Sequence, residues 1–290
     1  MHKFLKAIGF SNIKKKDLEI IKDEIIERPD FVKVTRDSED YEFVEISKMY
    51  ANNVGITLRG SYDETDVFHM DYYFPFVYSD ELSTSELIDI EKHAAKESYA
   101  GVCDEIRLGI TLIFYLQNVA DFLSEHRHNI QVKGLRGAYL SGLSADGMIL
   151  LPLQEKVLEK QTVNKKYEKR SQLIAEARGG NEEAIDNLTL QDMDTYNSIS
   201  KRIKKEDLFS IVRTTFMPYG IESDQYCVIG EIIEFEELTN KLTGENIYTM
   251  LLECNDLTFK VTINKKDLMG EPAVGRRFKG MVWMQGAVCL

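Results

Sequence analysis

Residues 226–263 read YCVIGEIIEFEELTNKLTGENIYTMLLECNDLTFKVTI, a stretch with three short runs rich in β-branched and aromatic residues. Such runs, bounded by short polar segments, are typical of β-strands. The first two are joined by TNKLTGE (239–245), whose glycine suits the loop of a hairpin. In the third run apolar and polar residues alternate, which gives that strand one apolar face: Leu257, Phe259, Val261 and Ile263. The stretch therefore predicts a hairpin followed by a third strand.

A fourth run, RRFKGMVWMQGAV (276–288), follows the third after a short helical link, KKDLMGEPAVG (265–275). Three strands, a short helix and a strand, in that order, are typical of a small OB-like Greek-key barrel. The fifth strand of such a barrel would come either from the segment after Gly286 or from TTFMPYGI (214–221). We therefore expect residues 212–290 to form an OB-like β-barrel domain.

Residues 1–154 combine two N-terminal helical segments with several strand-like runs. In the second helical segment, KKKDLEIIKDEIIERP (14–29), apolar residues recur at helical spacing and Pro29 provides a stop. The runs that follow, beginning with FVKVTR (31–36), are punctuated by Asp, Gly, Asn and Ser. Because most of these runs succeed one another without an intervening helix, they predict an antiparallel sheet and hence an α+β domain.

Residues 155–211 contain almost no runs typical of β-strands, and we expect them to form a helical segment that packs on the sheet. A long helical pattern ends at Gly179-Gly180. Asn181 and Thr189 each suit the N-cap of a further helix. The predicted fold is thus α+β throughout, with a helical middle between two sheet-forming zones.

Composition limits the compartment and the partner. The net charge of −12 argues against nucleic acid as the partner and leaves a protein partner open. The longest apolar run, LGITLIFYL (108–116), is far shorter than the roughly 20 residues that a membrane helix needs, so we expect no membrane contact. The four cysteines are scattered and the N-terminus lacks a secretory pattern, so a cytoplasmic location is predicted.

Four phrases carry a resemblance to a known family: MHKFLKAIGF (1–10), KESYAGVCDE (96–105), LTLQDMDTYNSISKRI (188–203) and FMPYGIESDQYCVIGEI (216–232). With these phrases the chain resembles a family of cytoplasmic proteins of unknown function from Gram-positive anaerobic bacteria. The resemblance runs nearly from end to end. It implies one intact bacterial protein, and it brings no catalytic residues to carry over.

The run 276–288 offers one candidate binding surface. In a strand, Arg277, Lys279 and Trp283 fall on one face, opposite the apolar alternate residues. With Lys260 on the neighbouring predicted strand, this face would stack bases and hold phosphates in the way OB folds do, which makes single-stranded nucleic-acid binding the weaker alternative. The alternative is an ordinary solvent-exposed face, on which these cations pair with acidic side chains of neighbouring strands.

The aromatic run DYYFPFVYSDE (71–81) offers another candidate surface. Tyr72, Phe74 and Phe76 share one face of the predicted strand, and the opposite face is apolar as well. Two apolar faces indicate a strand covered on both sides, and Pro75 favours an edge strand or an irregular one. The run therefore predicts either core or, less favoured, a groove for a partner or ligand.

For an enzyme, the least weak candidates are His93 and Cys103, in EKHAAKESYAGVCDE (91–105). A cysteine–histidine pair must meet in space, and a small buried thiol explains Cys103 equally well. The pairs His126 with His128 and His69 with Asp71 lack the set of ligands that a metal site needs, so we predict no metal and no cofactor.

We therefore expect a non-catalytic binding or scaffold protein that contacts another protein. The alternative is an enzyme whose site lies in the N-terminal domain and carries no recognisable motif.

Overall fold

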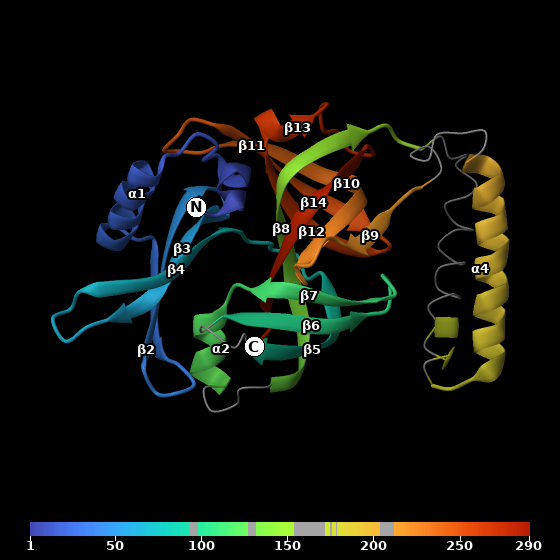
Figure 1. Cartoon of the computed structure of the whole chain (residues 1–290), viewed down its shortest axis with the longest axis horizontal. Helices are drawn as coiled ribbons and strands as arrows, with labels where there is room; N and C mark the ends of the chain where they lie inside the picture. Colours follow the sequence, from blue (N-terminus) through green and yellow to red (C-terminus); the bar gives the residue numbers. More distant parts are fainter. Residues whose placement is uncertain (93–97, 127–131, 154–171, 175, 178, 204–211) are drawn as a thin grey trace.

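A four-stranded antiparallel sheet forms the N-terminal part of the protein in the computed structural model (Figure 1). The structure describes residues 1–92, 98–126, 132–153, 172–174, 176–177, 179–203 and 212–290. The strands of the first sheet lie in chain order: β1 (Phe31–Arg36), β2 (Glu42–Ala51), β3 (Val54–Tyr62) and β4 (Phe68–Val77). The strand predicted at residues 31–36 is confirmed with the same bounds.

Two hairpin turns with the same chemistry set the register of this sheet. In the first, Asp37 Oδ1 accepts hydrogen bonds from the N–H groups of Glu39 and Tyr41, and Asp40 takes a positive φ of 69°. In the second, Asp63 Oδ1 accepts from Thr65 and Val67 in the same way. Aspartate suits both turn positions because its side chain caps nearby N–H groups and it tolerates the left-handed region.

Two N-terminal helical segments lie beside this sheet, as predicted. They are the 3₁₀ helix η1 (Lys3–Ile8) and the helix α1 (Lys15–Glu27). The left-handed Gly9 ends η1 and donates its N–H to Lys6 O. Most apolar side chains of both segments lie in one buried cluster with the inner residues of β2, β3 and β4, so η1, α1 and the sheet share a core.

A larger mixed sheet forms the rest of the protein, with the strand order β11-β12-β8-β5-β6-β7-β14-β10-β9. Its strands are β5 (Thr84–Lys92), β6 (Tyr99–Glu105), β7 (Ile110–Leu116), β8 (Val132–Leu150), β9 (Thr215–Pro218), β10 (Gln225–Thr239), β11 (Asn246–Cys254), β12 (Leu257–Asn264), β13 (Leu268–Met269) and β14 (Arg277–Val288). Two additional pairings, β10 with β11 and β8 with β14, connect strands that are distant in this order. The pairings therefore form two rings that share β8 and β14.

The long strand β8 joins the two sheet-forming zones of the sequence. It pairs with β5 and also, in parallel, with β12, and it pairs with β14 along most of its length. Strand β8 thus lies between β12 and β14. Strand β9 lies in the segment 214–221, which was one candidate for a fifth strand, and it pairs with β10. The protein is a sheet-dominated α+β protein with few helices. The OB-like form of residues 212–290 and the division at residues 154 and 212 stay predictions.

Further helical elements are α2 (Val119–His126), the short 3₁₀ helix η2 (Lys265–Asp267) and α4 (Glu182–Ile203). Asn181 caps α4, because its Oδ1 accepts from the N–H groups of Glu183 and Ala184. The second cap predicted at Thr189 is wrong: its hydroxyl donates to Ile185 O inside one continuous helix. No helix in the described ranges has the length and hydropathy that crossing a membrane requires.

Alternation along β14 divides its side chains between two cores. Phe278, Val282 and Met284 belong to the cluster inside the larger sheet, together with the predicted apolar face of β12. Trp283 belongs to the cluster that η1, α1 and the four-stranded sheet share. The predicted alternation is therefore confirmed, and β14 connects both halves of the protein.

Candidate interaction edge

The strand β1 lies at an edge of the four-stranded sheet and carries large apolar side chains into solvent. Phe31, Val32 and Val34 are 51%, 48% and 58% exposed. Within the described residues, β2 is the only strand that pairs with β1. Natural proteins usually shorten, charge or cover such an edge because it invites another strand to pair. We call this strand and its unpaired side the β1 edge.

The backbone of β1 presents hydrogen-bonding groups at that edge. Asp37 donates its N–H to Tyr41 O at 2.8 Å, and this bond shows which residues turn toward β2. In an antiparallel pair, successive residues direct their N–H and C=O groups alternately toward and away from the partner. The backbone groups of Val32, Val34 and Arg36 therefore point away from β2, where an added strand would meet them.

The opposite side-chain set of β1 is fixed to helix α2. Lys33 Nζ lies 2.6 Å from Asp121 Oδ2, and Ser124 Oγ donates to Thr35 Oγ1 at 3.2 Å. Both side chains of the Lys33–Asp121 pair are more than a third exposed, so this ion pair adds little stability. The two contacts show that this face of β1 lies against α2, and the side chains of Val32 and Val34 lie on the other face.

A row of charged and polar side chains continues from Lys33 into the protein. The strand register places Lys33 opposite Glu45, Glu45 opposite Arg59, and Arg59 opposite Tyr72. Arg59 is fully buried and donates from Nε to Glu45 Oε2 at 2.9 Å. Burial raises the pKa of Glu45, and the Arg59 guanidinium opposes that rise. Such a pair is destabilising to break, because either charge alone would be buried without compensation.

The Arg59 guanidinium also connects the four-stranded sheet to the larger one. It donates to the Tyr115 hydroxyl at 3.0 Å, to Leu116 O at 3.3 Å and to Gln117 O at 2.7 Å. The carbon of the guanidinium lies 4.6 Å from the centroid of the Phe74 ring, in cation–π contact. The whole set of donors is thus satisfied inside the core, and β2 and β3 form a rigid support for β1.

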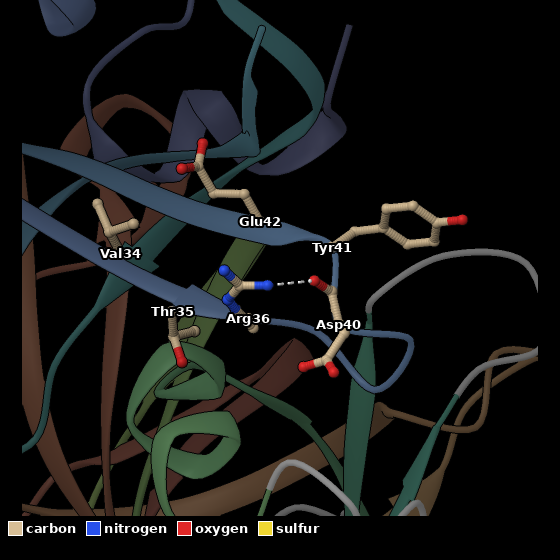
Figure 2. A pocket seen from close by; sticks show the side chains of 6 residues that line it. All are labelled: Val34, Thr35, Arg36, Asp40, Tyr41 and Glu42. Carbon is tan, nitrogen blue, oxygen red and sulfur yellow. Dashed lines mark hydrogen bonds between the residues drawn. The ribbon is translucent and has the colours of Figure 1, made fainter. Parts of the chain in front are cut away.

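A hollow of about 530 Å³ lies at the hairpin end of β1, and Figure 2 shows the side chains that line it. Val34 and Glu42 point to the same side of the two strands, whereas Thr35 points toward α2. Arg36 donates to Asp40 O at 3.1 Å, and the Tyr41 ring, which is 68% exposed, extends away from the sheet (Figure 2). A side chain from an added strand would find space beside Val34 here.

Carboxylates flank β1 at both ends. Asp30 precedes the strand, while Asp37 and Glu39 follow it in the turn. Asp30 accepts the Met49 N–H, and Asp37 accepts backbone N–H groups of the turn. Neither these two residues nor Glu39 forms an ion pair with another described residue. Lys92 donates to Ser38 Oγ at 2.8 Å within this turn. The β1 edge is therefore apolar in its middle and has more acidic than basic residues at its ends.

The cationic face predicted on β14 lies largely inside the protein. Arg277 is 4% exposed and donates to Leu151 O and Val212 O. Trp283 is 6% exposed, donates from Nε1 to Asp224 Oδ2 at 2.7 Å and stacks on Phe4. These two residues pack against different neighbours, and neither presents its side chain to solvent.

The other two predicted basic residues are partly buried. Lys279 follows Phe278 on β14 and is half-buried. Lys260, on β12, donates to Asp80 Oδ2 at 3.3 Å. The structure does not bring Lys260, Lys279 and Trp283 together as one exposed platform.

The predicted aromatic strand is β4, and it lies at the edge of its sheet opposite β1. This confirms the edge position that Pro75 predicted. Phe74 and Phe76 are 2% and 0% exposed, and Tyr72 accepts a hydrogen bond from Arg59. The aromatic side chains thus belong to the core, as the preferred prediction had it, and β1 carries the exposed apolar residues.

Only one of the two predicted catalytic candidates can be placed. Cys103 lies on β6 and is 2% exposed, and burial followed by the charge of Glu105 raises the pKa of its thiol to about 12. A thiol in this state is not a nucleophile at neutral pH. His93 lies outside the described residues, as does His128. Within the described ranges, no group of three or more His, Cys, Asp or Glu is placed to hold a metal ion.

Sequence reasoning identified β1 as a strand but gave it no functional role. The sequence did contain a usable indication: FVKVTR has apolar residues on both alternating faces and acidic residues on both sides. Apolar residues on both faces of a strand usually indicate that the strand is buried in the core. Its position at the edge depends on pairing with β2 alone, which the local sequence does not reveal.

Together these features define a sheet-dominated α+β protein in which β1, paired with β2 alone among the described strands, lies on a rigid support. The chain belongs to the family described as "Domain of unknown function, E. rectale Gene description (DUF3881)", whose model matches residues 5–286. This confirms the predicted resemblance to a family of unknown function across nearly the whole chain. Separate comparisons with curated proteins and with solved structures each found no match.

Proposed function

We propose that this protein is a non-catalytic binding protein, and that its β1 edge pairs with an extended strand of a partner protein. The observation that carries the proposal is the combination of outward backbone groups with half-exposed Phe31, Val32 and Val34. Strand addition of this kind draws affinity from main-chain hydrogen bonds and specificity from alternate side chains.

The rigid support behind β1 favours this role. One face of β1 lies against α2, where Lys33 contacts Asp121. The buried Arg59 pairs with Glu45 and donates to Gln117 O, which ties the next two strands to the larger sheet. A strand that is already ordered loses little further conformational entropy on binding. The proposal therefore assigns the four-stranded sheet to partner contact and the larger sheet to support.

A protein partner fits these observations better than nucleic acid or a chemical substrate. Trp283 and Arg277 are buried, so the predicted stacking platform offers no open aromatic surface. Cys103 is buried with a raised pKa, and the hollow beside β1 is lined by Arg36, Asp40 and Glu42 without a histidine or cysteine. A partner protein remains the occupant that the exposed apolar edge supports.

The experiment places a photo-crosslinking amino acid at Val34 and, as a matched control, at Leu242, which is 47% exposed on the β10–β11 turn. Crosslinking is carried out in the cells that produce the protein, and the captured partner is then purified. We expect that the partner is captured from position 34 alone and slows hydrogen exchange at Val32 and Val34. Capture from both positions alike, or protection confined to another element, would contradict the proposal.

A further inference from the structure

The ends of β1 suggest which kind of strand it accepts. Between residues 27 and 42 there are six acidic and three basic residues. The cations within β1 are engaged: Lys33 with Asp121, and Arg36 with Asp40 O. The carboxylates of Asp30 and Glu39 form no ion pair with other described residues. Arg28 precedes Asp30, and Lys92 donates to Ser38 Oγ in the turn, but acidic residues outnumber basic ones at both ends of the apolar edge.

We infer, on the basis of the proposed function, that the partner segment is an extended peptide with small β-branched residues in its middle and lysine or arginine at both ends. β1 has six residues, which span about 20 Å at the usual strand rise. A partner segment of similar length places its flanking residues beside Asp30 at one end and Glu39 at the other. Opposite charges facing each other across adjacent strands are favourable.

The two faces of β1 also set the alternation in the middle of that segment. On one face the exposed side chains of Val32 and Val34 would pack against aliphatic side chains of the partner segment, and the hollow beside Val34 has room for one such side chain. On the other face Lys33 and Thr35 lie against α2, where short hydroxyl side chains fit. A sequence that alternates valine with threonine satisfies both faces.

A second copy of this chain is a poorer occupant. If two β1 strands paired antiparallel, Asp30 of one copy would approach the Asp37–Glu39 turn of the other, and the same would hold at the second end. A parallel pairing would place Asp30 beside Asp30. Like charges opposite each other are destabilising, and each chain carries a net charge of −12. The charge pattern thus favours a different, basic partner.

The test uses three fluorescein-labelled peptides that share the core Val-Thr-Val-Thr-Val and differ in having two lysine, two serine or two glutamate residues at each end. Their binding to the full chain is followed by fluorescence polarisation at low and at high salt. We expect the lysine peptide to bind at least tenfold more tightly than the glutamate peptide, a difference of about 1.4 kcal/mol that several weak exposed charge contacts supply together. High salt should reduce this difference.

Two variants and one modified peptide identify the site. In Val34→Pro the lost N–H is one that points away from β2, so we expect binding to fall at least roughly tenfold while the β1–β2 pairing is retained. In Glu39→Lys the preference for the lysine peptide should decrease while the serine peptide binds as before. A lysine peptide N-methylated at the residues that face β1 should not bind, whereas methylation of the alternate residues should leave binding intact.

The outcomes separate this inference from the proposed function. If all three peptides bind equally and all lose affinity to Val34→Pro, the strand-accepting role stands and the basic partner is wrong. Failure of the lysine peptide to bind at low salt would also overturn the basic partner, and the crosslinking experiment would then decide the role of the edge. A concentration-dependent dimer that Val34→Pro abolishes would assign the edge to a second copy instead.

Discussion

Replacing Arg59 with methionine tests the buried pair that supports the β1 edge. The substitution removes a fully buried guanidinium that donates to Glu45 and to Gln117 O, and it leaves the carboxylate of Glu45 in the core. Breaking a buried ion pair in this way costs about 3–5 kcal/mol. The matched control, Lys33→Met, changes the exposed end of the same row and should cost less than about 1 kcal/mol.

The pH dependence follows from the carboxyl that remains. Burial already raises the pKa of Glu45, and removing Arg59 takes away the charge that opposed the rise. In the variant, the folded state therefore binds a proton that the unfolded state binds only at lower pH. The stability lost by Arg59→Met should decrease as the pH falls through the raised pKa, since protonation removes the buried charge.

The assay is urea unfolding of wild type, Arg59→Met, Glu45→Gln and the double variant, at neutral and at mildly acidic pH. We expect the double variant to be more stable than Arg59→Met at neutral pH, because no unpaired charge remains in the core. The reasoning would be refuted if Arg59→Met cost less than about 1 kcal/mol at neutral pH. It would also be refuted if the double variant were no more stable than the single one.

Four further predictions concern other parts of the fold. Burial lowers the pKa of His2 from 6.5 to about 4, so the unfolded state binds a proton at a higher pH than the folded state does. In urea titrations, wild type should therefore lose stability relative to His2→Phe as the pH falls from about 6.5 to about 4. Gly101→Ala would place a Cβ 2.2 Å from the Phe114 ring and should lower the free energy of unfolding by about 1–3 kcal/mol. Asn181→Ala should cost about 1 kcal/mol of α4 stability, visible as lost helical circular dichroism, and unchanged helicity would contradict the cap. The Cys103 thiol should resist alkylation in the folded protein and react after unfolding in urea.

Local patterns predicted much of the fold. The runs at 31–36 and 257–263 lie in β1 and β12, and the apolar face expected on β12 lies in the core. Strands β5 and β6 were missed, because the first alternates charges with only a few apolar residues and the second contains small residues at Ala100 and Gly101. Periodicity alone identifies a strand poorly when large β-branched side chains are few.

Long-range pairing explains what the sequence could not show. The position of β8 beside both β12 and β14 depends on contacts between residues more than a hundred positions apart. The alternation along β14 predicted which residues share a face, but the face of Trp283 is covered by Phe4 and its neighbours in η1. The exposure of one side of β1 could not be predicted from the sequence for the same reason, since it depends on which strands pair with each other.

Residue-resolved hydrogen exchange in the free protein tests the openness of the β1 edge most directly. We expect the amides of Val32, Val34 and Arg36 to exchange quickly, while those of Lys33 and Thr35 are slowed by their bonds to β2. Addition of the lysine-flanked peptide should slow exchange of the first set and leave the second nearly unchanged. Slow exchange of all five amides in the free protein would show that the edge is already covered, and would contradict the account.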